Sequence, residues 1–210
     1  MGANNMLEFE RELWDKGYRN IACIDEVGRG CLAGDVVACA IILPMELLIE
    51  GVKDSKKLTP KKRETLYDVI TENAVAIGIG SVDPKTIDEL NIKECTLIAM
   101  KKAIEALKDK DGNPVTPDFV LIDAEKLAID IPQKSIIKGD EKCHGIAAAS
   151  IIAKVYRDRK CGEWAKKYPD YSFEKHKGYG TKVHIDAIKK YGPCLIHRES
   201  FLKKIIGARK

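Results

Sequence analysis

The stretch "IACIDEVGRGCLAG", residues 21–34, leads an apolar run into two adjacent acids and then into a glycine-rich turn. Residues 21–24 predict a buried strand, and Asp25 and Glu26 follow at its end. Side chains alternate between the two faces of a strand, so we expect Glu26 to belong to the turn. The acids are either cap residues before a surface turn or part of a metal site that faces a polyanion.

The composition limits the classes of protein to consider. The 210 residues suffice for one domain with a good core, and a net charge of +4 is compatible with nucleic acid without singling it out. Residues 1–18 lack the apolar region of a signal peptide, and no run reaches the roughly 18 apolar residues of a membrane span. The seven cysteines form no C-x-x-C pair, so we expect reduced, mostly buried thiols in a cytoplasmic protein rather than structural zinc or disulfides.

Apolar periodicity and turn residues predict the order of the elements. Thr59 and Asp83 suit the N-caps of two helices. A hairpin followed by strands alternating with helices predicts an α/β fold, in which a mixed sheet is flanked by helices and no linker divides the chain. The expected strands cover residues 20–25, 36–44, 74–82, 118–123 and 131–140, and the expected helices cover 6–16, 57–73, 83–90, 91–107, 141–168 and part of the tail.

Acidic residues fall at three of the predicted strand ends: Asp25 with Glu26, then Asp123, then Asp140. Ligand sites in such sheets form just beyond strand ends, and carboxylates are ligands that Mg²⁺ prefers. Two such ions about 4 Å apart can activate a water and stabilise the departing oxygen of a phosphodiester. Taken singly, Asp123 could cap a turn, Asp140 could cap a helix, and Glu26 could be solvated.

Two basic loops and the glycine turn offer contacts to nucleic acid. In "KDSKK", a hydroxyl and lysine ammonium groups could bind a phosphate together. "HKGYG" holds a tyrosine between glycines, which suits stacking on a sugar or a base, although a core tyrosine is the alternative. In "GRG", the backbone can approach a ligand closely and read a 2′-hydroxyl. The candidate substrate-binding residues are Gly28, Arg29, Gly30, Lys53, Ser55, Lys56 and Tyr179.

Together these motifs resemble the type 2 ribonucleases H, the ribonuclease HII family. The ordered motifs are "DEVGRGCLAG", "VKDSKKL", "VLID", "KGD" leading into "IAAASIIAKVYRD", "YPDYSFEKHKGYGTKVH" and "HRESF". The resemblance implies an RNase H-like fold with a central mixed five-stranded sheet in one catalytic domain, residues 1–210. An N-terminal helix would lie within about residues 1–17 and a C-terminal helical part within about 165–210. The catalytic and metal-binding acids would be Asp25, Glu26, Asp123 and Asp140, with two Mg²⁺ or Mn²⁺ ions.

The resemblance also implies an activity. The protein would be an endoribonuclease that hydrolyses the RNA strand of RNA/DNA hybrids. It would also incise 5′ of ribonucleotides embedded in duplex DNA, leaving a 3′-hydroxyl and a 5′-phosphate, as in ribonucleotide excision repair. The "GRG" turn would recognise the 2′-hydroxyl, Tyr179 would stack on the adjoining deoxyribose, and Lys53, Ser55 and Lys56 would lie near phosphates.

Some features depart from the family or from its sister type. Asp35 stands where proline is usual, and Ala124 stands where glycine commonly follows the third acid. The type 3 enzymes usually carry lysine in place of Arg29 and an extra N-terminal domain, which the 20 residues before the first strand do not provide. We expect a monomer with no membrane partner, and protein partners stay open. A catalytically silent hybrid-binding protein and a junction resolvase of the same fold are the alternatives.

Overall fold

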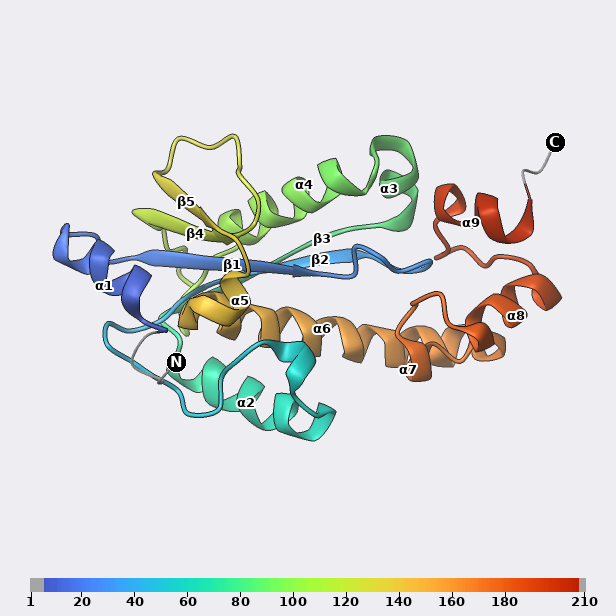
Figure 1. Cartoon of the computed structure of the whole chain (residues 1–210), viewed down its shortest axis with the longest axis horizontal. Coiled ribbons are helices and arrows are strands. Elements are labelled where there is room, and N and C mark those ends of the chain that lie inside the picture. Colours follow the sequence, from blue (N-terminus) through green and yellow to red (C-terminus); the bar gives the residue numbers. More distant parts are fainter. Residues whose placement is uncertain (1–5, 208–210) are drawn as a thin grey trace.

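The computed structural model describes residues 6–207 and contains one mixed five-stranded sheet, in the order β3-β2-β1-β4-β5 (Figure 1). The first three strands along the chain pair antiparallel, and the last two run parallel to β1. This arrangement confirms the predicted α/β class and the RNase H-like fold. The strands are β1 (Ile21–Val27), β2 (Val36–Ile42), β3 (Ala76–Val82), β4 (Phe119–Asp123) and β5 (Gln133–Ile136).

Strand β1 extends through both acids. In its antiparallel ladder with β2, Asp25 lies opposite Cys39 and Glu26 lies opposite Ala38. The prediction that Glu26 belongs to the turn is therefore wrong, because the apolar run of β2 keeps the ladder paired as far as Val27. The two acids consequently leave the sheet on opposite faces.

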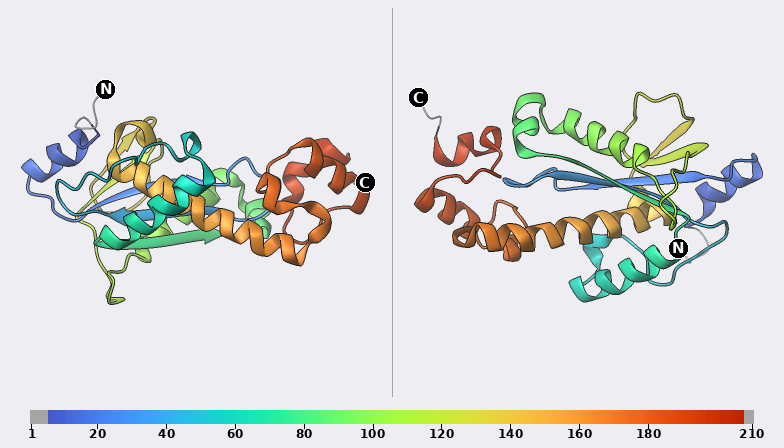
Figure 2. Two further views of the ribbon diagram at one scale, coloured as in Figure 1. Left: turned by 90° about the horizontal axis from the view of Figure 1, so that it is seen from below. Right: turned by 180° about the vertical axis from the view of Figure 1, so that it is seen from behind.

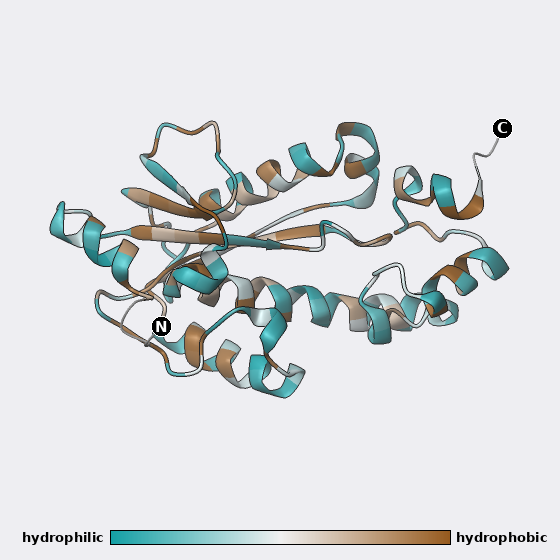
Figure 3. Ribbon diagram, in the orientation of Figure 1, coloured by the Kyte–Doolittle hydropathy of each residue, from teal (hydrophilic) through white to brown (hydrophobic). Residues whose placement is uncertain are grey.

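Helices cover both faces of the sheet (Figures 1 and 2). On one face lies α6 (His144–Lys167), with α2 (Pro60–Asn73) outside it, and on the other lie α3 (Pro84–Leu90) and α4 (Ile92–Glu105). Helix α6 packs directly on β1 and β2 through small residues that are fully buried: Ala147, Ala148, Ala149 and Ala153. Figure 3 shows the apolar residues concentrated along the strands. None of the helices in the described part of the chain is long and apolar enough to cross a membrane.

The predicted caps of two helices are confirmed. Thr59 Oγ1 accepts a hydrogen bond from the backbone N–H of Lys62 at 3.3 Å, and Asp83 Oδ1 accepts one from Thr86 at 3.1 Å. Each cap satisfies a backbone donor that the first helical turn leaves without an intrahelical partner.

The last strand is shorter than predicted. It ends at Ile136, opposite Asp123, where β4 itself ends and offers no further backbone to pair with. Lys138 then adopts a left-handed conformation (φ 58°), and the short helix α5 (Gly139–Lys142) begins. Asp140 is therefore the second residue of this helix, and the prediction that it ends a strand is wrong.

The chain ends in a group of short helices beyond the β1–β2 hairpin (Figure 1). They pack around a small core of their own, formed by Phe173, Ile188 and Leu202, which includes Leu32 and Ala33 from the glycine turn. The remaining elements are α1 (Glu8–Asp15), η2 (Ser55–Lys57), η3 (Pro169–Tyr171), α7 (Phe173–His176), α8 (Lys182–Tyr191) and α9 (Glu199–Ile206). Helix α1 lies near the start of the chain and helices α7, α8 and α9 lie near its end, while residues 1–5 and 208–210 of the predicted helical ranges lie outside the described residues.

Candidate active site

The structure brings the four predicted acids to one edge of the sheet. Burial first, and then the negative charges of Glu26 and Asp123, raise the pKa of Asp25 well above its ordinary value. Burial and Asp123 also raise the pKa of Glu26 and of Asp140, although Arg29 and Lys56 offset part of the effect. Asp123 is thus an electrostatic neighbour of each of the other three acids.

Backbone hydrogen bonds fix two of these carboxylates. Asp25 Oδ1 accepts the N–H of Glu26 at 2.8 Å, and Asp123 Oδ1 accepts the N–H of Gly139 at 2.7 Å. The second bond joins the end of β4 to the start of α5, so it places Asp140 near Asp123. A turn-capping role would therefore account for Oδ1 of Asp123 but not for its Oδ2.

Within the described residues, only one oxygen of the Glu26 carboxylate has a partner. Its Oε1 lies 3.4 Å from Arg29 Nη1, while Oε2 is buried and has no hydrogen-bond partner among residues 6–207. Arg29 Nη1 is also 2.9 Å from Glu125 Oε1. Sequence reasoning missed Glu125, and its position two residues beyond Asp123 is the one signal that could have indicated it.

The donor set fits a hard divalent cation. Three acids with raised pKa values face two cationic side chains, and one carboxylate oxygen is orphaned, so added positive charge would relieve the repulsion. The four acids lie near one another, but their carboxylates are not as close as ligands of one bound ion would be. Within the described residues, no three of these four acids have ligand atoms all within 4.8 Å of one another.

The "KDSKK" segment contributes one cation at the acids. Lys56 Nζ lies 3.6 Å from Asp140 Oδ2. Burial lowers the Lys56 pKa, but nearby aspartates, Asp140 and Asp25 first among them, together raise it overall. Ser55 is buried, and its hydroxyl lies 2.7 Å from that of Ser150 on α6. Lys53 is exposed. Ser55 therefore anchors the segment from which Lys56 projects, whereas contacts of Lys53 and Ser55 with phosphate stay predictions.

The two glycines of the "GRG" turn have different surroundings. Gly28 has a φ of +93°, and a Cβ there would overlap the side chain of Arg157. Gly30 has no such φ, and a Cβ there would meet no atom of the described residues within 4 Å. The fold therefore requires glycine at position 28 but not at position 30, where the absence of a side chain leaves space for a ligand.

Two buried arginines attach this turn to the rest of the molecule. Arg198 donates to Gly34 O at 2.7 and 2.9 Å and to Arg29 O at 2.9 Å. Arg157 donates to Ala33 O at 2.9 Å and to Lys177 O at 2.7 Å. Sequence reasoning missed both, because an arginine that binds backbone carbonyls has no acidic partner to pair with in the sequence.

Tyr179 lies beside the turn. Its side chain is 41% exposed, which excludes the core alternative, and partial burial and the nearby Cys31 raise its pKa. Behind it, His184 Nδ1 is 2.9 Å from Tyr179 O, and the rings of His176 and His184 stack with centroids 4.2 Å apart. Burial lowers the pKa of His184 to about 4, so this imidazole is neutral at neutral pH and supports the loop.

The two departures from the family pattern have visible consequences. Ala124 adopts a φ of 51°, a left-handed conformation that favours glycine, directly after Asp123. Asp35 lies at the start of β2, where its carboxylate is 3.2 Å from Lys160 and its carbonyl accepts from Arg157 at 3.0 Å. Contacts of Asp35 with Lys160 and Arg157 therefore hold the start of β2, whereas a proline would hold it by restricting its own backbone.

The chain is similar in sequence to proteins of one known family. A family model described as Ribonuclease HII matches residues 22–204. Ribonuclease HII of Alkaliphilus oremlandii is 57% identical over 200 residues, which are 95% of this chain and 98% of that protein. Ribonuclease HII of Bacillus subtilis is 53% identical over 197 residues, which are 94% of this chain and 75% of that protein.

Two solved structures are also similar. The ribonuclease H2 from Pyrococcus horikoshii has a TM-score of 0.73 and 27% sequence identity, over 89% of this chain and 97% of that one. The ribonuclease HII in a PCNA complex from Archaeoglobus fulgidus has a TM-score of 0.74 and 25% identity, over 90% and 97%.

Proposed function

The chain belongs to the ribonuclease HII family, and from that premise we propose that it incises duplex DNA 5′ of embedded ribonucleotides, besides cleaving RNA in RNA/DNA hybrids. Family membership makes it a type 2 ribonuclease H, a hydrolase with endonuclease activity on RNA paired with DNA. The products would be a 3′-hydroxyl and a 5′-phosphate, and the setting would be ribonucleotide excision repair in the cytoplasm.

The observation that carries the proposal is the position of the acids beside the "GRG" turn. Asp25, Glu26, Asp123 and Asp140 would hold Mg²⁺ or Mn²⁺. When bound, two such ions would activate the attacking water and stabilise the leaving 3′-oxygen. The raised pKa values and the orphaned Oε2 of Glu26 support this role, because a bound cation removes both penalties.

The turn would select the ribonucleotide. The space above Gly30 would admit the ribose, so that backbone groups of the turn reach its 2′-hydroxyl as donor and acceptor. Glu26 and Glu125 fix Arg29 at the acid cluster, and Tyr179 would stack on the neighbouring deoxyribose. Lys56, beside Asp140, would bind a substrate phosphate as a point charge.

The test is cleavage of two duplexes, one DNA with a single ribonucleotide and one RNA/DNA hybrid, with Mg²⁺, with Mn²⁺ and with EDTA. Asp25→Asn is expected to abolish cleavage of both and to leave binding largely intact. Glu141→Gln is the matched control, because Glu141 adjoins Asp140 in α5 but pairs outward with Lys57.

Full activity of Asp25→Asn with Mg²⁺ would refute the assignment of the acids. Binding without metal-dependent cleavage by the unaltered protein would favour a silent hybrid-binding protein. Preference for an all-DNA junction over both duplexes would favour a resolvase.

A further inference from the structure

A second group of ionisable side chains lies on the α6 side of the sheet, and one of its members, Cys23, precedes Asp25 by two residues on β1. Glu10 comes from α1, Cys23 from β1 and Cys143 from the residue before α6. One ligand atom of each lies within 4.8 Å of the other two. All three residues are buried, with exposed fractions of 5%, 3% and 0%.

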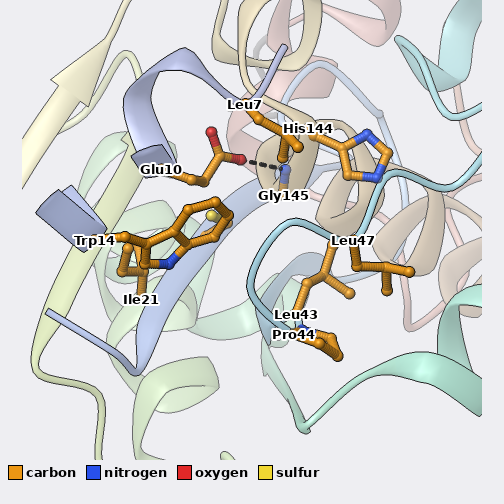
Figure 4. A pocket seen from close by; sticks show the side chains of 10 residues that line it. Leu7, Glu10, Trp14, Ile21, Leu43, Pro44, Leu47, His144 and Gly145 are labelled. Atoms are coloured by element: carbon orange, nitrogen blue, oxygen red, sulfur yellow. Dashed lines mark hydrogen bonds between the residues drawn. The ribbon is translucent and has the colours of Figure 1, made fainter. Parts of the chain in front are cut away.

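The hydrogen bonds of Glu10 leave half of its carboxylate unused. Oε1 accepts the N–H of Gly145 at 3.0 Å, which Figure 4 draws, and lies 3.2 Å from Cys143 Sγ. Oε2 is buried and has no hydrogen-bond partner in the described part of the chain. A buried carboxylate oxygen without a partner is destabilising, which points to a ligand that the hydrogen bonds do not account for.

A small cavity adjoins the group. Its volume is about 10 Å³, and Glu10, Cys23, Trp14 and His144 are among the residues that line it (Figure 4). His144 Nε2 accepts the N–H of Ile49 at 3.0 Å, so Nδ1 carries the ring proton, and this donor also has no partner within residues 6–207. The cavity has about the volume that one water requires, and two of its lining residues, Glu10 and His144, each carry a buried polar atom without a hydrogen-bond partner.

We propose that Glu10, Cys23 and Cys143 bind one thiophilic divalent cation of the zinc type, with a water in the cavity as the fourth ligand. Two thiolates, one carboxylate and a water are a ligand set that zinc accepts in tetrahedral geometry. Bonds of about 2.0–2.3 Å would put the ligand atoms roughly 3.3–3.8 Å apart, within the distance that contains the trio.

Binding would also change the protonation of the group. Burial raises the pKa of Cys143 well above its ordinary value and raises that of Glu10, so without a cation the Cys143 thiol keeps its proton at neutral pH. The cation would displace the thiol protons into solvent and would hold the carboxylate ionised, which makes its affinity rise with pH.

The site would link the first helix to the acid cluster through the backbone. Cys143 N–H donates to Gly139 O at 2.8 Å, at the start of the helix that carries Asp140. A cation bound by Glu10 and Cys143 would therefore fasten α1 to the segment that positions Asp140.

The experiment titrates the full-length, reduced protein with Co²⁺ in the presence of excess Mg²⁺, which is added to fill the hard-oxygen site proposed at the four acids. The readouts are thiolate-to-cobalt charge-transfer absorption and the visible bands of tetrahedral Co²⁺. We expect saturation at one equivalent and displacement by Zn²⁺. Cys23→Ser and Cys143→Ser are expected to lose the charge-transfer band or most of its intensity. Cys95→Ser, which alters a fully buried cysteine of α4, is expected to keep it.

If the unaltered protein shows no charge-transfer band with Co²⁺, no thiolate binds the metal and the proposal is overturned. A band that survives unchanged in Cys143→Ser would place the metal elsewhere. Should circular dichroism show that a serine variant does not fold, Glu10→Gln keeps both thiols and is expected to weaken Co²⁺ binding by about tenfold or more. Unchanged affinity of that variant would exclude Glu10 as a ligand and overturn the site as proposed.

Discussion

At the scale of single residues, Gly28 and Gly30 separate what the fold needs from what a ligand needs. Gly28→Ala is expected to reduce the free energy of unfolding by about 2 kcal/mol or more, because it combines a left-handed φ with an overlap against Arg157. Gly30→Ala is expected to change it by less than about 0.5 kcal/mol, because its Cβ meets open space. Urea denaturation of both variants measures the difference.

The activity of Gly30→Ala completes this prediction. The variant is expected to fold normally yet to show a raised KM for a duplex with one ribonucleotide, because the methyl group occupies the space proposed for the ribose. Wild-type kinetics from a stably folded Gly30→Ala would show that the ligand does not approach the turn at this position.

Asp25 allows a prediction about pH. Burial and the charges of Glu26 and Asp123 raise its pKa, so between the unfolded and folded pKa values the metal-free folded protein binds more protons than the unfolded chain. The contribution of Asp25 to stability is therefore present at low pH and is lost as pH rises through the folded pKa. In EDTA at pH 7, Asp25→Asn is expected to melt several degrees higher than the unaltered protein, since 1 kcal/mol corresponds to roughly 2–4 °C at this size.

Thermal melts at pH 5, 6 and 7 check the sign. The advantage of Asp25→Asn is expected to shrink at the lower pH values and when Mg²⁺ is added, because both treatments relieve the repulsion in the unaltered protein. A variant that melts below the unaltered protein at every pH would show that the Asp25 carboxylate stabilises the metal-free fold.

At the scale of elements, glycines let a helix lie directly on a strand. A Cβ at Gly80 of β3 would overlap the carbonyl oxygen of Ala99, and one at Gly78 would overlap that of Ala103, both on α4. Gly80→Ala is therefore expected to lower the free energy of unfolding by about 3 kcal/mol, the upper end of what overpacking causes. The urea midpoint should fall with an unchanged m-value.

Gly162 in α6 is the matched control, because a Cβ there would meet no described atom within 4 Å. Gly162→Ala is expected to stabilise the protein by up to about 1 kcal/mol, since alanine is the better helix former. Similar destabilisation by both substitutions would mean that the contact between α4 and β3 is not the cause.

Local signals predicted elements well and strand ends poorly. The caps at Thr59 and Asp83 were predictable, because a side chain and a backbone donor three residues apart suffice to make them. The ends of β1 and β5 were not, because the partner strand decides them: β2 holds Glu26 in its ladder, and β4 ends before it could pair residues 137–140.

At the scale of the whole molecule, the candidate site brings together segments that are far apart in the sequence: the turn after β1 and the residues near 198. Strand-end acids predicted that Asp25 and Asp123 would meet, since β1 and β4 lie side by side in parallel. No local pattern predicted that the turn after β1 would be fixed to residues near 198, because backbone carbonyls, which every residue carries, are the acceptors.

Arg198 is the test of that connection. It is fully buried, and burial lowers its pKa to about 10, so it remains charged at neutral pH. Arg198→Lys keeps the charge but cannot reach the carbonyls of both Gly34 and Arg29 with a planar fork. Losing one or two charge-assisted hydrogen bonds is expected to reduce the free energy of unfolding by about 2–4 kcal/mol.

The same change should affect substrate more than chemistry. Because Arg198 holds the carbonyl of Arg29 directly, the variant is expected to raise the KM for a duplex with one ribonucleotide more than it lowers kcat. Arg159→Lys is the control, because Arg159 is half exposed and pairs with Glu64, an interaction worth about 0–1 kcal/mol. If both substitutions affected stability equally and left KM unchanged, the carbonyl contacts of Arg198 would not be what holds the turn over the acids.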